Sequence, residues 1–463
     1  IEKDWEKAGD YFRTGLAGID YYRIPRPRWE SLHDLQGLVE LYSITGDDRY
    51  RQSFLHHWHS IRRWDRHNSG AFSSGEQATG NPYQPAAIET CCTVAWMAIT
   101  LDALRLTGDP VAADELERST YNGMIGAYNP GGSWCTYNTP MDGVREASHH
   151  TIVFQARAGT PDLNCCSVNG PRGLGMLSEW GVMQSADGVT VNYYGPLEAA
   201  WKLADGANLV LKQETRYPLD GNVRLVLRPE KPSELTLRVR IPGWATRASV
   251  GVPGSPAAAA RPGTYFECRR RWNAGDTVSL SFDMPLRYEA GDLEAFGRMS
   301  VYRGPLLLAY DQGLNPFDEE GIPVLTPSML AAARITFPSP SSEEERIGRF
   351  TPWLVAEIPV GKGLPRNVAQ PPRNAAQPPR NAAQPPRNVA QPPSAVRDLP
   401  AQPGAAVRTT QAQPGAAVPL AGAAVPLAGA AVPQAVLRLC DFATAGSTGA
   451  RYVSWLPAGE MAP

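Results

Sequence analysis

The stretch PAAIETCCTVAWMAITLDALRLTGD, residues 85–109, decides the fold of the first part of this chain. From Val94 to Leu104 its apolar residues recur at the three- and four-residue intervals of a helix and cover most of the helix circumference. Thr107-Gly108-Asp109 then supplies the glycine and the turn residue that commonly end a helix. The stretch therefore predicts a largely buried helix with a vicinal cysteine pair, Cys91-Cys92, near its beginning.

Neighbouring segments repeat this pattern. Residues 32–42 (LHDLQGLVELY) have apolar side chains at helical spacing and end at another Thr-Gly-Asp, residues 45–47. A further helical segment, Ala112–Ile125, follows the first Thr-Gly-Asp after a short loop. We therefore expect residues 1–185 to be mainly helical and to form antiparallel hairpins stacked side by side.

Period-two alternation replaces the helical pattern near Val189. In residues 235–241 (LTLRVRI) leucine, valine and isoleucine point one way, and Thr236, Arg238 and Arg240 point the other. This spacing predicts a β-sandwich over residues 186–338, and apolar patterning in the tail, 436–463, predicts that it supplies the closing strands. Turn residues separate the strands at 218–221, 242–243 and 273–276.

A segment of low complexity, residues 339–435, interrupts the β-region. Its arginines recur every seven residues at Arg366, Arg373, Arg380 and Arg387, but each repeat contains Pro-Pro, which forbids a coiled-coil helix. Few apolar residues are present to drive folding. The segment is predicted to be a disordered insertion or an extended polyproline-II spacer.

Composition excludes several classes of protein. The 463 residues carry 44 Lys+Arg against 46 Asp+Glu, so no basic excess is available to bind nucleic acid. No apolar run of membrane-spanning length is present, and no membrane association is expected. Seven cysteines, two pairs of them vicinal, do not resemble a disulfide framework and favour a reducing, cytoplasmic location. The oligomeric state stays open.

The strongest chemical signal is the combination of Glu89, Cys91 and Cys92 with Cys165 and Cys166. Two or three thiolates and a carboxylate complete a tetrahedral zinc shell, and a bound dication keeps those thiols ionised. The alternative is a set of buried cysteines that pack as small apolar residues.

Three other features of the sequence bear on a possible function. Glu76, in the loop before the cysteine-bearing helix, is a general acid/base or a solvated helix cap. His149-His150 could reach a site from a loop, but a surface position is the simpler interpretation. Residues 170–173 (GPRG) lack the context of a phosphate-binding loop, so a nucleotide site is not expected.

In the motifs around Glu76, Glu89 and Cys165, the sequence resembles the β-L-arabinofuranosidases of glycoside hydrolase family 127 and its relatives. The helical part supplies Gly75-Glu76, 88–91 (IETC) and 164–166 (NCC). The β-region and the tail supply further motifs in matching order: 213–218 (QETRYP), 240–244 (RIPGW), Arg271-Trp272, Gly275-Asp276, 303–305 (RGP) and 441–446 (DFATAG), with Tyr452 and Trp455.

The resemblance implies an (α/α)6 barrel, here partial, followed by a β-sandwich. It implies a zinc ion held by Glu89, Cys91, Cys165 and Cys166, with Cys165 as nucleophile and Glu76 as general acid/base. The implied activity is that of a retaining glycosidase that releases non-reducing-end β-L-arabinofuranose or a related sugar from a glycan.

The sequence also departs from the family pattern. The loop between Glu76 and Glu89 is short, and Cys92 adds a thiol beside the metal ligands. Six helical hairpins need roughly 300 residues, so about half of a barrel is expected to lie upstream of this chain. Two alternatives therefore stay open: a non-catalytic, zinc-stabilised carbohydrate-binding protein, and a polysaccharide lyase built on the same helical toroid.

Overall fold

The computed structural model describes residues 10–24, 29–72, 75–84, 87–128, 135–145, 165–203, 206–339, 351–360 and 435–459. The arginine-containing repeats, predicted to be disordered, lie outside the described residues. Within these ranges no helix combines the length and the apolar character that crossing a membrane requires.

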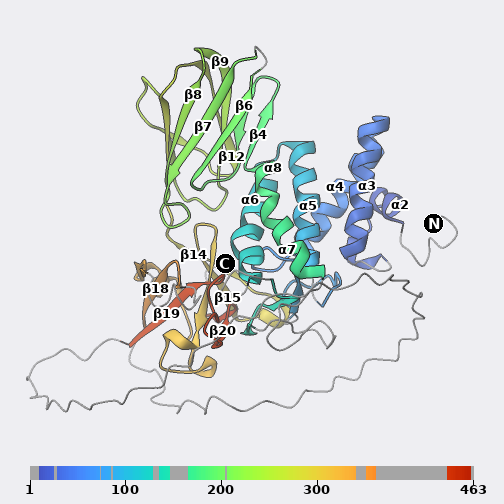
Figure 1. Ribbon diagram of the computed structural model, residues 1–463. Coiled ribbons are helices and arrows are strands. Elements are labelled where there is room, and N and C mark those ends of the chain that lie inside the picture. The colour runs from blue at the N-terminus through green and yellow to red at the C-terminus, as the bar shows by residue number, and fades with distance from the viewer. Residues whose placement is uncertain are drawn as a thin grey trace, which may run out of the picture. The chain divides into compact units, whose positions relative to one another are not determined.

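The helical part contains three long helices that lie side by side, α3, α4 and α5, together with shorter ones (Figure 1). Each predicted Thr-Gly-Asp turn joins two helices: Gly46 and Gly108 adopt positive φ angles of 69° and 62°, and the following Asp47 and Asp109 cap the next helix. The prediction of helical hairpins is confirmed for these two pairs. The helices are α2 (Tyr11–Leu16), α3 (Trp29–Thr45), α4 (Asp48–Trp64), α5 (Thr90–Thr107), α6 (Pro110–Arg118), α7 (Cys165–Gly175) and α8 (Leu177–Trp180).

Helix α5 is the centre of the helical core. Every residue from Thr90 to Leu101 is buried, as the apolar circumference of the sequence predicts. Helices α4 and α6 pack beside it. Helix α6 continues into a π-helical turn, Ser119–Met124, and a 3-10 turn, Ile125–Ala127, so the predicted segment Ala112–Ile125 is helical but changes its winding.

Two sheets of mainly antiparallel strands follow the helices. One has the strand order β11-β10-β13-β8-β7-β6 and the other the order β12-β9-β5-β4. Their buried side chains, including Leu235, Leu237, Val239 and Ile241, belong to one core. The strands are β4 (Val182–Ser185), β5 (Gly188–Val191), β6 (Leu197–Lys202), β7 (Asn208–Thr215), β8 (Asn222–Pro229), β9 (Ser233–Ile241), β10 (Ala248–Gly251), β11 (Ala258–Ala260), β12 (Thr264–Trp272) and β13 (Asp276–Phe282).

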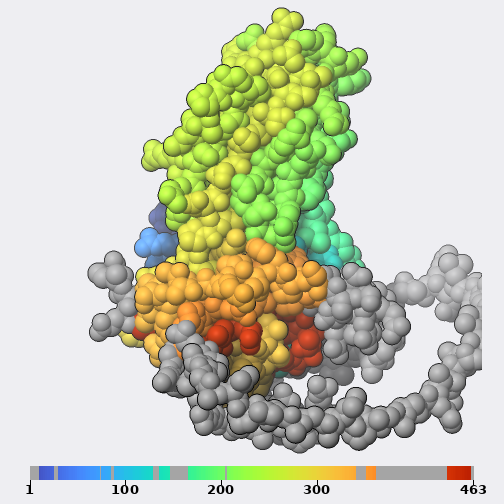
Figure 2. Space-filling view, turned by 90° about the vertical axis from the view of Figure 1, so that its left-hand side faces the viewer, coloured from blue at the N-terminus to red at the C-terminus, as the bar shows by residue number. Residues whose placement is uncertain are grey.

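A third sheet combines strands from distant parts of the chain. Strand β19, from the tail, lies between β16 and β18, and Figure 2 shows the tail (red) against residues of the preceding strands (orange). The tail therefore pairs with strands of the β-region. The strands are β3 (Gly143–Val144), β14 (Leu286–Ala290), β15 (Arg298–Arg303), β16 (Leu306–Asp311), β17 (Arg334–Thr336), β18 (Val355–Val360), β19 (Ala435–Asp441), β20 (Arg451–Val453) and β21 (Leu456–Pro457).

One predicted boundary is wrong. Strand β18 lies inside residues 339–435, which were assigned as a whole to a disordered insertion. Val355, Ala356, Ile358 and Val360 are buried, and β18 pairs along its whole length with β19. This short apolar strand is stabilised by a partner more than 70 residues away in sequence. The low-complexity sequence beside it therefore hides the apolar pattern that would predict a strand.

A buried arginine joins the sheets to the helices. Arg240 lies on the face of β9 opposite to Leu235 and its neighbours, yet its side chain is fully buried. It forms ion pairs with Asp114 and Glu117 of α6, the second at 2.6 Å. The Tyr217 hydroxyl also donates to Glu117, at 2.6 Å.

Replacing Arg240 by alanine is expected to lower the free energy of unfolding by about 3–5 kcal/mol, because it leaves the buried carboxylate of Glu117 and the partly buried carboxylate of Asp114 without a counter-charge. Urea unfolding measures the change. Arg238→Ala on the same strand is the matched control: Arg238 also binds two carboxylates, but those of Asp187 and Glu267 are exposed, so about 1 kcal/mol or less is expected. Equal effects for the two variants would contradict this interpretation.

Candidate functional site

Two helices and one short strand begin or end at the cysteine cluster. Strand β1 (Ala87–Glu89), paired with β2 (Asn138–Pro140), ends at Glu89, which is also the N-cap residue of α5. Cys91 lies in the first turn of α5, and α7 begins at Cys165. Positive helix ends therefore point at the thiols, and such positions favour thiolates.

The structure brings Glu89, Cys91, Cys165 and Cys166 together. One ligand atom from each lies within 4.8 Å of the others, an arrangement that could hold a metal ion. The Sγ atoms of Cys91 and Cys166 are 3.1 Å apart, and Cys166 Sγ is 3.8 Å from Glu89 Oε1. Glu89, Cys91 and Cys166 are buried, whereas Cys165 is exposed, so only its thiol can be reached from outside.

Two glycines of α7 allow close packing against Cys135 and Met124. A Cβ on Gly170 would lie 2.1 Å from Cys135 Sγ, and a Cβ on Gly173 would lie 2.4 Å from Met124 Sδ. These two glycines therefore let α7 approach its neighbours in the helical core. This packing, and not phosphate binding, accounts for the GPRG stretch at 170–173.

The three thiols of the cluster cannot all ionise by themselves. Hydrogen bonds from Cys166 and Cys91 lower the pKa of Cys165 to about 3. Burial raises the pKa of Cys166 strongly, and the hydrogen bond to Cys165 raises the pKa of Cys91. The cluster thus stabilises one thiolate, on Cys165, and a bound cation would be needed to ionise the other two thiols.

Glu76 is linked to this cluster through Tyr137. The Tyr137 hydroxyl donates to Glu76 Oε1 at 3.1 Å, while the tyrosine ring packs with Cys91 and Cys166. Burial, with the Glu89 and Glu76 carboxylates nearby, raises the pKa of Tyr137 well above its usual range, so its hydroxyl stays protonated as a donor. Glu76 has a positive φ of 73°, a strained conformation for a residue with a side chain.

Comparison with known proteins relates this arrangement to one family. Residues 9–179 match the family description "Beta-L-arabinofuranosidase, GH127 catalytic domain", and residues 188–284 match the corresponding middle domain. Together the two matches span more than half of the chain. The chain belongs to glycoside hydrolase family 127.

Individual family members are similar over different lengths. The non-reducing end β-L-arabinofuranosidase of Bifidobacterium longum is 26% identical over 301 residues, which are 61% of this chain and 45% of that protein. The chain thus spans less than half the length of this curated relative.

Two solved structures share the fold. One, described as a glycoside hydrolase, is 21% identical and has a TM-score of 0.70. The aligned region covers 99% of this chain and 70% of the other protein's chain. A family 127 β-L-arabinofuranosidase from Geobacillus stearothermophilus T6 is 19% identical with a TM-score of 0.64, covering 94% of this chain and 61% of its own. They support a multidomain fold of helices and sheets.

The contacts of two residues beside the cluster, Asn169 and Tyr137, were not predicted from the sequence of this family 127 member. Asn169 donates from Nδ2 to Cys91 Sγ at 3.2 Å, and Tyr137 binds Glu76. Asn169 stands four residues after Cys165, one helical turn along α7, so its spacing was an available signal. No sequence spacing pointed to Tyr137 in the same way.

The additional thiol, Cys92, is buried, and its Sγ lies 2.9 Å from Glu89 Oε2, the oxygen that does not face Cys166. His149 and His150 lie outside the described residues.

A buried aspartate anchors the loop that follows Glu76. Asp65 is 3% exposed, and its Oδ1 accepts hydrogen bonds from the N–H groups of Thr79 and Gly80, at 2.7 and 2.8 Å. Within the described residues its Oδ2 has no hydrogen-bond partner. Burial raises the pKa of Asp65 to about 7 from 3.8, although both N–H groups act in the opposite direction.

This pKa makes stability depend on pH. Between about pH 4 and pH 7 the native state keeps a proton that the unfolded chain has released, so the stability contributed by Asp65 falls as the pH rises. Asp65→Asn keeps an acceptor oxygen for the loop and removes this loss. We expect the variant to be more stable by roughly 1–3 kcal/mol at pH 8 and nearly unchanged at pH 4. Urea unfolding at both pH values measures this, and equal destabilisation at both would contradict it.

Proposed function

We propose that this chain carries the catalytic centre of a retaining glycosidase that releases non-reducing-end β-L-arabinofuranose, or a related sugar, from a glycan. The observation that carries the proposal is the convergence of Glu89, Cys91, Cys165 and Cys166 within 4.8 Å, in a chain of family 127. The name of the Bifidobacterium longum relative supports the choice of sugar.

We further propose that the metal is zinc. Three sulfurs and one carboxylate oxygen form a donor set that zinc binds tetrahedrally, with zinc–sulfur distances of about 2.3 Å and therefore sulfur–sulfur distances of about 3.8 Å. The 3.1 Å between Cys91 and Cys166 and the 4.8 Å limit for the whole set require only small side-chain movements to match it. When bound, zinc would supply positive charge that keeps the thiols ionised and oriented.

Cys165 is proposed as the nucleophile. Its thiol is the exposed member of the cluster, and its lowered pKa favours the thiolate. Attack of Sγ on the anomeric carbon would form a carbon–sulfur bond as the bond to the leaving oxygen breaks, giving a glycosyl-cysteine intermediate. Water would then cleave this bond, and two successive inversions retain the anomeric configuration.

Glu76 is proposed as the general acid/base. It would protonate the leaving oxygen in the first step and remove a proton from water in the second. The Tyr137 hydroxyl, by donating to Oε1, would fix the orientation of the carboxyl group. Asn169 would hold Cys91 through its hydrogen bond to Sγ.

The finer architecture is also part of the proposal. The two helical hairpins joined by Thr-Gly-Asp turns are repeat units of the kind that build an (α/α)6 barrel, and we assign residues 1–185 to part of such a barrel. The two sheets with a common core support the β-sandwich assigned to 186–338, with strands from 436–463 closing the β-region.

Hydrolysis of a synthetic aryl β-L-arabinofuranoside, followed by proton NMR, tests the proposal. We expect release of L-arabinose, with the β-anomer appearing first because the configuration is retained. Initial appearance of the α-anomer would exclude the double-displacement mechanism. With a uronate-containing polysaccharide as a second substrate, an unsaturated sugar product would indicate a lyase. Binding of a glycan without turnover would indicate a carbohydrate-binding protein.

A further inference from the structure

A cleft of about 410 Å³ is lined by residues outside the cysteine cluster. Its walls come from the end of α4 and the residues just after it, from α6, from β14, and from the loops after β9, before β12 and after β15. Neither the cluster nor any residue of the buried helix α5 lines it. The volume falls within the range of roughly 300–1,000 Å³ that is common for small-ligand sites.

Arginines on one wall share a single carboxylate. Glu115, 5% exposed, receives ion pairs from Arg62 Nε at 3.1 Å and from Arg66 Nε at 3.0 Å. The contact with Arg66 lacks hydrogen-bond geometry, so both Arg66 Nε and Glu115 Oε2 are buried atoms with no hydrogen-bond partner among the described residues. Apart from the ion pair between them, these two atoms are open to a hydrogen bond with water or a ligand.

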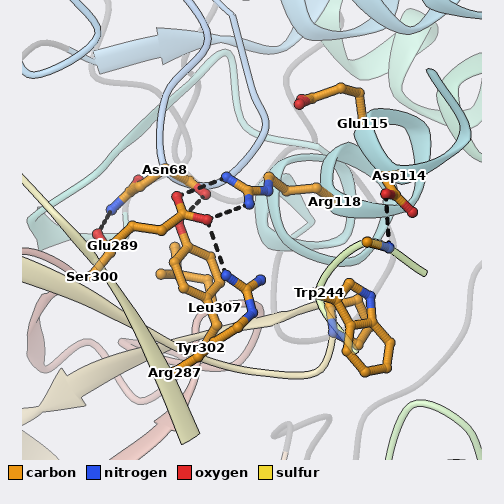
Figure 3. Close-up of polar contacts among 12 residues, drawn as sticks. Asn68, Asp114, Glu115, Arg118, Trp244, Arg287, Glu289, Ser300, Tyr302 and Leu307 are labelled. Atoms are coloured by element: carbon orange, nitrogen blue, oxygen red, sulfur yellow. Dashed lines mark hydrogen bonds and ion pairs between the residues drawn. The ribbon is translucent and has the colours of Figure 1, made fainter. Parts of the chain in front are cut away.

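The other wall repeats this arrangement. Arg118 binds both carboxylate oxygens of Glu289, at 3.0 and 2.5 Å, and Arg287 Nη1 binds Glu289 at 3.0 Å, as Figure 3 shows. Arg287 Nε is a third buried atom that has no hydrogen-bond partner in the described part of the chain. Three such polar atoms therefore belong to residues that line this one cleft.

The charges around the cleft do not balance. Four arginines and four carboxylates line the cleft, and two of these carboxylates, those of Asp114 and Glu117, also pair with Arg240, which is buried behind the wall. With Arg240 included, five guanidinium groups stand against four carboxylates, so this group of residues carries one excess positive charge. A ligand that carries a negative charge suits this balance.

An indole ring completes the lining. Trp244 Nε1 donates to Glu117 Oε2 at 3.0 Å, and the ring packs against Tyr217 and Phe282. The indole is therefore held in place while it lines the cleft, as Figure 3 shows beside Asp114. A fixed aromatic ring among hydrogen-bonding charged groups suits a ring-shaped, polyhydroxylated ligand.

We propose that this cleft is a second saccharide-binding site, separate from the catalytic cluster, that takes a uronic acid residue of a glycan. The carboxylate of the sugar would bind the guanidinium groups of Arg62 and Arg66, its ring would lie near Trp244, and its hydroxyl groups would bind Glu115 and Arg287. The site would hold an acidic glycan on the protein independently of hydrolysis.

Calorimetric titration of the full chain at low ionic strength tests the proposal with trigalacturonic acid, neutral galactotriose and sodium phosphate as separate probes. We expect trigalacturonic acid to bind, galactotriose to bind at least about tenfold more weakly, and Arg62→Gln to weaken the acidic ligand by about tenfold. Sodium chloride at about 1 M should weaken wild-type binding as well. Arg105→Gln is the matched control, because Arg105 is similarly exposed and paired with Glu179.

Several outcomes would overturn the proposal: no binding of trigalacturonic acid, equal binding of galactotriose, or unchanged binding by Arg62→Gln. Displacement by phosphate at equal concentration would show a simple anion site. Because binding is measured without turnover, the result stands whether or not the chain hydrolyses an arabinofuranoside. Circular dichroism of Arg62→Gln verifies its folding, and the salt dependence of the wild-type protein requires no variant.

Discussion

Replacing Cys165 by alanine is expected to reduce the hydrolysis of an aryl β-L-arabinofuranoside by roughly 10⁴-fold or more. The variant lacks the only exposed thiol of the cluster, and loss of a nucleophile commonly removes nearly all chemical catalysis. Initial rates at saturating substrate, with metal content measured on the same samples, determine the effect.

The control for this experiment is Cys268→Ala. Cys268 is a partly exposed free cysteine on β12, far in sequence from the cluster, and its removal should leave the rate unchanged. Retention of most activity in Cys165→Ala would show that another group attacks the anomeric carbon. If Cys165→Ala loses both activity and metal, Cys165→Ser, which keeps an oxygen at that position, separates loss of the nucleophile from loss of the metal.

Replacing Cys166 by alanine is expected to remove bound zinc and to lower the free energy of unfolding by about 3 kcal/mol or more beyond the cost of the cavity. Cys166 is fully buried, and its Sγ contacts both Cys91 and Glu89. Metal binding of this kind contributes directly to folding stability, because the unfolded chain has no preformed site. Metal analysis and urea unfolding measure the two effects.

Cys440→Ala supplies the matched control. Cys440 is also a fully buried free cysteine, but it lies in β19 away from the cluster, so its truncation has only a packing cost. The excess destabilisation of Cys166→Ala over Cys440→Ala should disappear when a strong chelator is present. An excess that persists in the chelator would mean that the cluster stabilises the fold by packing alone.

Some features follow directly from local sequence. Residues 94–104 are apolar around most of the helix circumference, so this helix must be buried whatever its neighbours are. The Thr-Gly-Asp turns fix the helix ends, because glycine accepts positive φ and aspartate caps the next helix. Alternation in residues 235–241 likewise gives the two faces of β9.

Other features depend on partners that are far away in sequence. β18 was missed because its six residues are stabilised by β19, and no local pattern distinguishes them from the surrounding low-complexity segment. Arg240 follows the alternation of its strand, but its burial depends on Asp114 and Glu117, 126 and 123 residues away.

The site shows the same division. By itself the sequence predicted the helical hairpins, the strand alternation and, through family motifs, the candidate set Glu76, Glu89, Cys91, Cys165 and Cys166. Only the tertiary structure decided which thiol is exposed, that Tyr137 holds Glu76, and that Arg118 and Glu289, 171 residues apart, meet at a charged cleft. Helical and strand periodicity is encoded within a few residues, whereas burial and ion pairing are set by chain segments that meet only after folding.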